Sequence, residues 1–219
     1  EDDAEEINTI GNPTFTSNRY GMSSKALKLD GIDDVLTEMP SAIFPTNNDV
    51  RNVIFWMKIN SGFSGYKTIY SDHKRNVNGT HNLLIKVSNE EQKINLIYTG
   101  RESSASKSIQ LAFNKFNEWV PVVISVSHNS STGQGGYTIT PHLYIGGVGD
   151  IYTNISDDYS GNNTQVSVSI GGRKPDIFGN EYTDLLEISV DDIWYNNTRT
   201  FTDSDVYIIS KDWIINSKL

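Results

Sequence analysis

The sequence predicts an all-β protein built as a two-sheet antiparallel sandwich. Short runs of alternating or β-branched apolar residues recur along the 219-residue chain, as expected for strands. Gly, Asn, Ser and Asp separate these runs at places where a tight turn needs a positive φ angle. Helical periodicity is nearly absent before the C-terminal segment. Many short strands at short spacing favour a sandwich over alternating strands and helices.

Twelve strands are expected, in order, and one helix follows them. The strands are 26–29, 35–39, 52–59, 67–71, 83–87, 93–98, 108–112, 119–127, 137–145, 151–154, 165–170 and 187–195. Turns are expected at 78–79, 135–136, 146–147, 161–162 and 171–172. The helix begins after Thr202, whose hydroxyl can cap the first N–H groups. Val206, Ile209 and Trp213 then follow at helical spacing.

Composition bounds the class of protein and its partners. Apolar residues make up 37% of the chain, which is enough for one sizeable core. The net charge of −9 argues against a nucleic-acid partner, because phosphate binding needs clustered Lys and Arg. No apolar run approaches the roughly 18 residues of a transmembrane span. With no Cys, disulfides and thiolate metal sites are excluded. We expect an acidic flexible tail over 1–10 and a single domain over 11–219.

The N-terminal residues suggest a mature or trimmed protein. The chain begins at Glu1 without an apolar signal segment, and its first six residues are mostly acidic. A solvated disordered tail is one interpretation. The stretch also resembles the acidic segment after the lipidated Cys of bacterial surface lipoproteins. Five Asn-x-Ser/Thr sequons would accept glycans in a eukaryotic secretory setting. We therefore expect an extracellular or cell-surface location, with a lipid anchor on a removed segment as a further hypothesis.

Four segments in order carry a family resemblance. They are 24–31 (SKALKLDG), 53–58 (VIFWMK), 119–126 (WVPVVISV) with 142–147 (HLYIGG), and 190–195 (VDDIWY) with 201–203 (FTD). Together they resemble the concanavalin A-like lectin/glucanase superfamily, and most of all its laminin-G-like branch. The resemblance implies a jelly roll of two curved antiparallel sheets. The chain departs from that pattern at Val120-Pro121, where relatives carry a His pair, and at Trp194, where they carry Arg.

The resemblance also implies a structural calcium ion. Members of the superfamily often hold Ca²⁺ between the N-terminal loop, the "FdG" loop and the Asp of the final strand. Calcium takes six to eight hard oxygen ligands, so carboxylates and carbonyls suit it. The corresponding ligands here would be Asp30 or Asp33, Asp191 or Asp192, and carbonyls near Gly11 and Asn12. The alternative is a set of solvated acidic turns in which Asp30 caps its own turn.

A lectin-like site needs an aromatic face for the apolar side of a sugar and short polar groups for its hydroxyls. The candidate ligand-binding residues are Tyr66, Tyr70, His73, Arg75, Asn78, Tyr98, Arg101, Tyr159 and Arg173. For any single Tyr the alternative is cross-strand packing. For the loop over 72–80 it is a solvated hairpin. Trp56 and Trp119 match core positions of the family, whereas Trp194 is expected near the surface.

Catalysis is disfavoured by the same pattern. Catalytic relatives carry Glu-x-Asp-x-Glu on an inner strand, whereas the nearest string here is EISVD over 187–191, with Ser189 in the middle position. No Gly-x-Ser-x-Gly elbow or His-x-x-x-His pair is present. The sequence therefore predicts a non-catalytic carbohydrate-binding module of a secreted or surface protein. An adhesion or scaffolding module for a cell-surface or matrix protein is the alternative, and a glycoside hydrolase is less favoured.

Overall fold

The computed structural model describes residues 8–37, 50–76, 79–99, 106–130, 137–146, 148–152, 155–157, 163–173 and 181–196. Throughout this part of the chain the regular elements are β-strands, and every pairing between them is antiparallel. The predicted all-β antiparallel sandwich is confirmed. The helix expected after Thr202 lies outside the described residues. Among the described residues, no helix has the length and apolar character needed to cross a bilayer.

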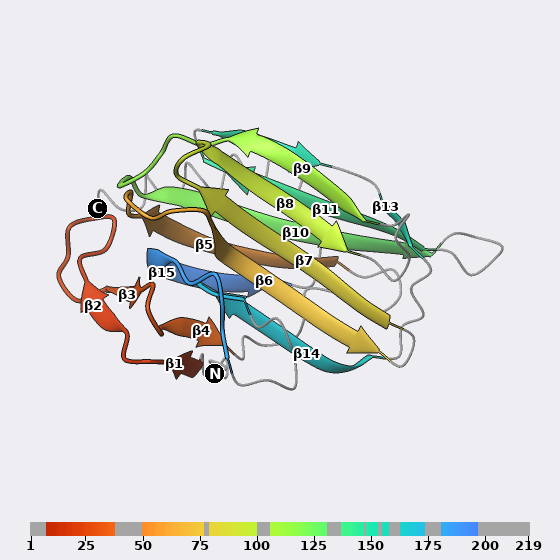
Figure 1. Ribbon diagram of the computed structural model, residues 1–219, viewed down its shortest axis with the longest axis horizontal. Coiled ribbons are helices and arrows are strands. Elements are labelled where there is room, and N and C mark those ends of the chain that lie inside the picture. The colour runs from red at the N-terminus through yellow and green to blue at the C-terminus, as the bar shows by residue number, and fades with distance from the viewer. Residues whose placement is uncertain are drawn as a thin grey trace.

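One layer is a 7-stranded sheet in the order β1-β4-β14-β6-β7-β8-β9. Its strands are β1 (Asn8–Ile10), β4 (Val35–Thr37), β14 (Asn163–Ile170), β6 (Tyr66–Asn76), β7 (Gly79–Ser88), β8 (Lys93–Thr99) and β9 (Lys107–Ala112). Strands β6 to β9 form a meander of neighbouring antiparallel strands. In Figure 1 this meander crosses in front of the second layer.

The other layer is an 8-stranded sheet in the order β12-β11-β10-β5-β15-β3-β2, with β13 paired to β11. Its strands are β12 (Gly149–Tyr152), β11 (Tyr137–Ile145), β10 (Val120–Ser130), β5 (Val50–Ile59), β15 (Glu187–Asn196), β3 (Ala26–Asp30), β2 (Thr14–Thr16) and β13 (Ile155–Asp157). The last described strand, β15, therefore lies between β5 and β3.

The core fills the space between the inner faces of the two sheets. On β5 the alternate residues Val53, Phe55, Met57 and Ile59 belong to this core cluster. Because successive side chains of a strand point to opposite faces, Ile54 and Trp56 project to the outer face. Both are nonetheless buried. Removal of an aliphatic core side chain from water contributes roughly 1.5–3 kcal/mol.

Each of the twelve expected strands overlaps a strand of the structure. Three short strands were not expected: β1, β2 and β13. The residues of β1 are all exposed, so no apolar alternation marks the strand in the sequence. Asn8, Thr9 and Ile10, the last residues of the predicted tail over 1–10, pair with β4. The division into a tail and a single domain stays a prediction.

A β-bulge interrupts β6 between Thr68 and Tyr70. Thr68 lies opposite Lys86 and Tyr70 lies opposite Ile85, so β6 carries one extra residue. An extra residue reverses which face the following side chains occupy. Tyr66 and Tyr70 are an even number of residues apart, yet only Tyr70 faces the core.

A second bulge interrupts β15 between Asp191 and Trp194. Asp191 lies opposite Trp56 and Trp194 lies opposite Ile54 on β5. Asp192 takes a positive φ of 48°, which absorbs the extra residue. As a result Trp194 shares the outer face with Asp191 and Trp56, while Ile193 packs against the core.

Candidate functional site

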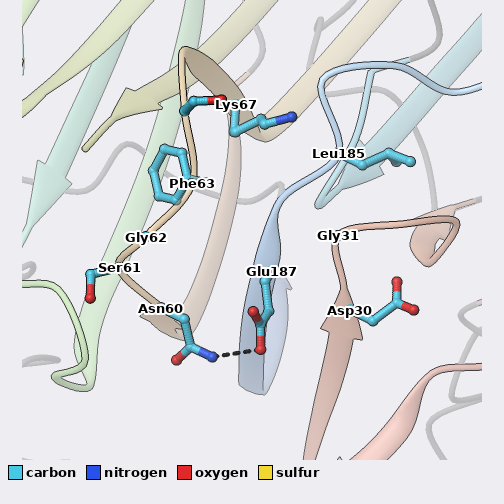
Figure 2. Close-up of a pocket in the computed structure, with 10 residues that line it drawn as sticks. Asp30, Gly31, Asn60, Ser61, Gly62, Phe63, Lys67, Leu185 and Glu187 are labelled. Carbon is cyan, nitrogen blue, oxygen red and sulfur yellow. Dashed lines mark hydrogen bonds between the residues drawn. The ribbon is translucent and has the colours of Figure 1, made fainter. Parts of the chain in front are cut away.

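A pocket of about 370 Å³ opens where the ends of β3, β5 and β15 meet. Its lining consists of two carboxylates, one amide, one amine, one aromatic ring, one leucine side chain and small loop residues. These are Asp30, Gly31, Asn60, Ser61, Gly62, Phe63, Ser64, Lys67, Leu185 and Glu187. Figure 2 shows that Asn60 and Glu187 face each other at the base of the view, with Phe63 and Lys67 on one side and Asp30 on the other.

Strand register positions the acidic side of the pocket. Asp30 is the last residue of β3 and lies directly opposite Glu187, the first residue of β15. The turn after β3 begins at Gly31, which has a φ of 76°. A Cβ added there would lie 2.6 Å from the backbone nitrogen of Glu187, so the close approach of the two strands requires glycine.

Glu187 is held in place from two directions. The Nδ2 of Asn60 donates a hydrogen bond of 2.7 Å to Oε1 of Glu187. The Nζ of Lys28 lies 2.8 Å from the same oxygen. The hydrogen bond from Lys28 is the main reason that the pKa of Glu187 lies below its usual value, and Asn60 adds to the effect. Partial burial and the charge of Asp30 act in the opposite direction. Glu187 is thus an ionised hydrogen-bond acceptor at neutral pH.

Phe63 supplies the apolar wall of the pocket. Its ring meets Phe116 edge to face at a centroid separation of 6.1 Å, and Phe116 meets Phe113 in the same way at 5.0 Å. Phe113 is fully buried in the core cluster. This row of rings fixes the position of Phe63 while one part of it lines the pocket. The pocket can therefore offer fixed donors and acceptors beside an apolar surface.

An acidic group lies beside the pocket. Among the described residues, carboxylate oxygens of Asp30, Asp33 and Asp34 come within 4.8 Å of one another. Asp34 is buried and accepts backbone N–H bonds from Asn12 at 2.7 Å and Asp30 at 3.0 Å. The N-terminal loop and the turn after β3 are therefore adjacent, as the calcium hypothesis requires. Calcium binding itself stays a prediction.

Asp191 and Asp192 lie away from that group and pair with Arg19 instead. The Nη1 of Arg19 lies 3.0 Å from Oδ2 of Asp191 and 2.5 Å from Oδ2 of Asp192. Burial is the main cause that raises the pKa of Asp191, the charge of Asp192 raises it further, and Arg19 opposes both. The four predicted metal ligands are thus not brought together in one cluster.

Two of the predicted aromatic contacts are wrong. Tyr70 and Tyr98 are fully buried in the core, so neither ring can stack on a ligand. Tyr66 lies on the outer face of the 7-stranded sheet and is half-buried. A hydrogen bond from its hydroxyl to Glu91 is the main cause that raises the pKa of Tyr66. The hydroxyl of Tyr66 and the carboxylate of Glu91 are thus hydrogen-bonded to each other.

The structure describes three of the other predicted residues. Arg173 is half-buried and joins Thr183 through paired backbone hydrogen bonds. His73 and Arg75 lie on β6 opposite Asn82 and Thr80 of β7. Asn78, Arg101 and Tyr159 lie outside the described residues. The described members of the predicted ligand-binding set are therefore divided between the core, the strand β6 and the bridge at Arg173.

Sequence reasoning missed Asn60, Phe63 and Lys67, which line the pocket. One signal was available: the loop over 60–65 reads NSGFSG, with a single aromatic residue among small polar ones between two strands. An exposed loop of that kind is where binding residues concentrate.

Comparison with known proteins gives structural matches only. No family model matches the chain, and no curated protein matches its sequence. The binding domain of botulinum neurotoxin serotype D matches with a TM-score of 0.60 and 16% identity, over 96% of this chain and 47% of that chain. The receptor-binding domain of the mosaic serotype C/D matches with a TM-score of 0.56 and 15% identity, over 95% of this chain and 46% of that chain. A type C neurotoxin structure matches with a TM-score of 0.59 and 13% identity, over 94% and 46%.

These matches support the fold. At such identities the likeness concerns the β-sandwich architecture. This chain spans slightly less than half the length of the neurotoxin chains that it matches. The relation to the concanavalin A-like superfamily remains a prediction from the sequence segments.

Proposed function

We propose that this chain is a non-catalytic carbohydrate-binding module of a secreted or cell-surface protein. The sugar binds in the pocket at the ends of β3, β5 and β15. The observation that carries this proposal is the pairing of a fixed acceptor, Glu187, with the aromatic ring of Phe63 in one open pocket.

The chemistry of a sugar matches that combination. A pyranose presents several hydroxyl groups, each a donor and an acceptor, beside an apolar face of C–H groups. Glu187 and Asp30 accept hydrogen bonds from hydroxyls, while Lys67 donates them. Phe63 covers the apolar face. Because contacts within the protein already hold Glu187 and Phe63, little side-chain freedom is lost when a ligand binds.

The same geometry argues against hydrolysis at this pocket. A general acid for glycoside cleavage needs a carboxyl group with a raised pKa. Lys28 and Asn60 shift the pKa of Glu187 in the opposite direction. Glu187 is therefore suited to accept a hydrogen bond from a hydroxyl and not to protonate a leaving group.

The structural neighbours lend support to a recognition role. Two of them are described as binding domains of neurotoxins, and the type C neurotoxin is described as depending on two ganglioside molecules for cell entry. This chain corresponds to under half of each neighbour, so the neighbours support only the use of this fold for recognition. The proposal does not assign their ligands to this chain.

A glycan array followed by calorimetry tests the proposal, with and without added Ca²⁺. We expect binding to one class of glycan, lost in Asn60→Ala and weakened in Phe63→Leu. Phe15→Leu is the matched control, since Phe15 is 71% exposed on β2 and does not line the pocket. No binding across a broad panel in the presence of Ca²⁺ would reject the proposal.

A protein partner is the second candidate. Phe15 and Ile32 are 71% and 76% exposed, and exposed large apolar side chains suit a protein interface. Replacement of both by Ser would then abolish attachment to cells or matrix protein and leave glycan binding unchanged. Loss of glycan binding in that variant would argue against a separate protein-binding surface.

A further inference from the structure

We propose that Lys28 is a positioning residue that makes the sugar-binding pocket selective for the orientation of one hydroxyl group. Lys28 does not line the pocket, and it acts by fixing the carboxylate of Glu187 from one side. The inference rests on the proposed function and specifies how the pocket distinguishes sugars that differ at a single carbon. It follows from which oxygen of Glu187 is engaged and from where β3 and β15 place the two residues.

The contacts that hold Glu187 end on one of its two carboxylate oxygens. The Nζ of Lys28 lies 2.8 Å from Oε1, and Nδ2 of Asn60 donates a hydrogen bond to the same atom at 2.7 Å. In the described part of the chain, no third group donates to Oε2. Because a carboxylate oxygen has about two acceptor sites, protein donors fill Oε1 and a ligand can use Oε2. The carboxylate therefore offers one acceptor atom in a defined place.

Strand pairing gives Lys28 a rigid place beside Glu187. In the antiparallel pair of β3 and β15, Asp30 lies directly opposite Glu187 and Lys28 lies opposite Ser189. Lys28 and Glu187 are thus diagonal neighbours on the outer face of the sheet, at a separation that a long side chain bridges. The amine comes from a strand and not from a loop, and a strand places a side chain more precisely.

A second lysine lies on the other side of β15 and does not hold Glu187. Lys58 on β5 also lies opposite Ser189, so the two lysines flank the same residue of β15. Among the described residues, only Lys28 pairs its amine with Glu187, and the contact from the β5 side comes from Asn60. Lys58 therefore has the charge and the register of Lys28 without the contact, which makes it the matched control.

A fixed acceptor distinguishes epimers, which are sugars that differ in the orientation of one hydroxyl group. A hydroxyl that points at Oε2 of Glu187 donates a charge-assisted hydrogen bond, which is about twice as strong as a neutral one. The epimer points away and leaves the acceptor without a partner, so its affinity is lower. A carboxylate free to rotate would follow either hydroxyl. Lys28 and Asn60 prevent that rotation, while Phe63 orients the sugar ring.

Calorimetry with four methyl hexosides tests the inference. The probes are the glycosides of glucose and of its epimers at C2, C3 and C4, which are mannose, allose and galactose. The proteins are the wild type, Lys28→Met, Glu187→Gln, the double variant of both, and the control Lys58→Met. In the wild type at least one pair of epimers should differ about tenfold in affinity.

Lys28→Met should lower the affinity for the preferred epimer about fivefold, because the ligand must then order Glu187 itself. The ratio between the epimers should fall to about twofold, since the freed carboxylate can follow either hydroxyl. Lys58→Met removes the same charge and should match the wild type. All four probes are uncharged, so a change in net charge alone does not alter their binding.

The double variant shows whether Lys28 acts through Glu187. In the Glu187→Gln background, Lys28→Met should change affinity by less than about twofold, because the carboxylate on which Lys28 acts is absent. A merely structural role would lower affinity equally in both backgrounds. The thermal midpoint of each variant shows whether it is folded.

Three results overturn the inference and leave the pocket and the proposed function intact. They are equal affinity of the wild type for all four hexosides, an epimer ratio in Lys28→Met as large as in the wild type, and a loss in Lys28→Met that is the same with and without Glu187. Absence of sugar binding by the wild type, on this panel and on the glycan array, rejects the proposed function and the inference with it.

Discussion

The guanidinium carbon of Arg19 lies 4.8 Å from the centroid of the Trp56 ring, on the outer face of the 8-stranded sheet. The same guanidinium pairs with Asp191, and the two charged side chains are only 8% and 4% exposed. Arg19 lies in the loop between β2 and β3, and Asp191 lies on β15. One contact therefore joins this loop to the last described strand. The stability of that junction can be measured.

Arg19→Ala should destabilise the protein by about 3–5 kcal/mol, because it leaves the carboxylate of Asp191 buried without its partner. Urea unfolding measures the change. Lys25→Ala is the matched control, since Lys25 is an exposed cation in the same loop. A loss under about 1 kcal/mol in Arg19→Ala would show that the pair behaves as a surface ion pair.

Gly31→Ala should cost more than Gly21→Ala. Both glycines have positive φ angles, 76° and 78°, so each replacement pays about 1–2 kcal/mol of backbone strain. Only at Gly31 does the new Cβ meet backbone, 2.6 Å from the nitrogen of Glu187. Thermal unfolding of the two variants isolates the clash. Equal losses would contradict the close approach of β3 and β15.

Glu187→Gln should change how stability depends on pH. Because the folded protein lowers the pKa of Glu187, the contribution of its ionised form is complete above about pH 4.3 and is lost as the pH falls through the folded pKa. The difference in thermal midpoint between wild type and variant should therefore shrink as the pH is lowered below that point. Glu118→Gln, at another surface Lys–Glu pair, is the control. A difference that grows toward acid pH would refute the assignment.

Deletion of Asp192 should remove the bulge in β15. Because Asp192 is the extra residue, Trp194 would then stand two positions after Asp191 and would keep the outer face opposite Ile54 in regular register. Asp192→Asn should cost less than about 1 kcal/mol, because Asn tolerates the positive φ of this position. Tryptophan fluorescence with urea unfolding follows both changes. A blue shift of the tryptophan emission in the folded deletion variant, as expected if Trp194 turned into the core, would contradict this register.

The strands of this protein could be predicted because burial on one face leaves a two-residue period in the sequence. Strand β9 shows that period, since Ile109 and Leu111 are half-buried against the core between exposed residues. Strand β5 is buried on both faces and stands out instead as a continuous apolar run. The short edge strands β1 and β2 do not, because their residues are mostly exposed and no face is selected.

The candidate binding residues were harder to predict because a bulge leaves no mark in composition. Tyr66 and Tyr70 have the spacing of residues on one face, yet the bulge at Thr68 sends Tyr70 into the core. In β15 the bulge has the opposite effect and brings Trp194 to the surface. The pocket also depends on which strand ends meet in space. The order of strands in a sheet cannot be predicted from any one sequence segment.

The place of β15 in the 8-stranded sheet has a consequence for how the protein is made. This strand lies between β5 and β3, yet it is the last described strand to leave the ribosome. Until then β5 and β3 each present an unpaired side, which is a template for aggregation. We therefore expect the nascent chain to need chaperone protection until β15 has been translated, and refolding to be slow because the closing contacts are distant in sequence.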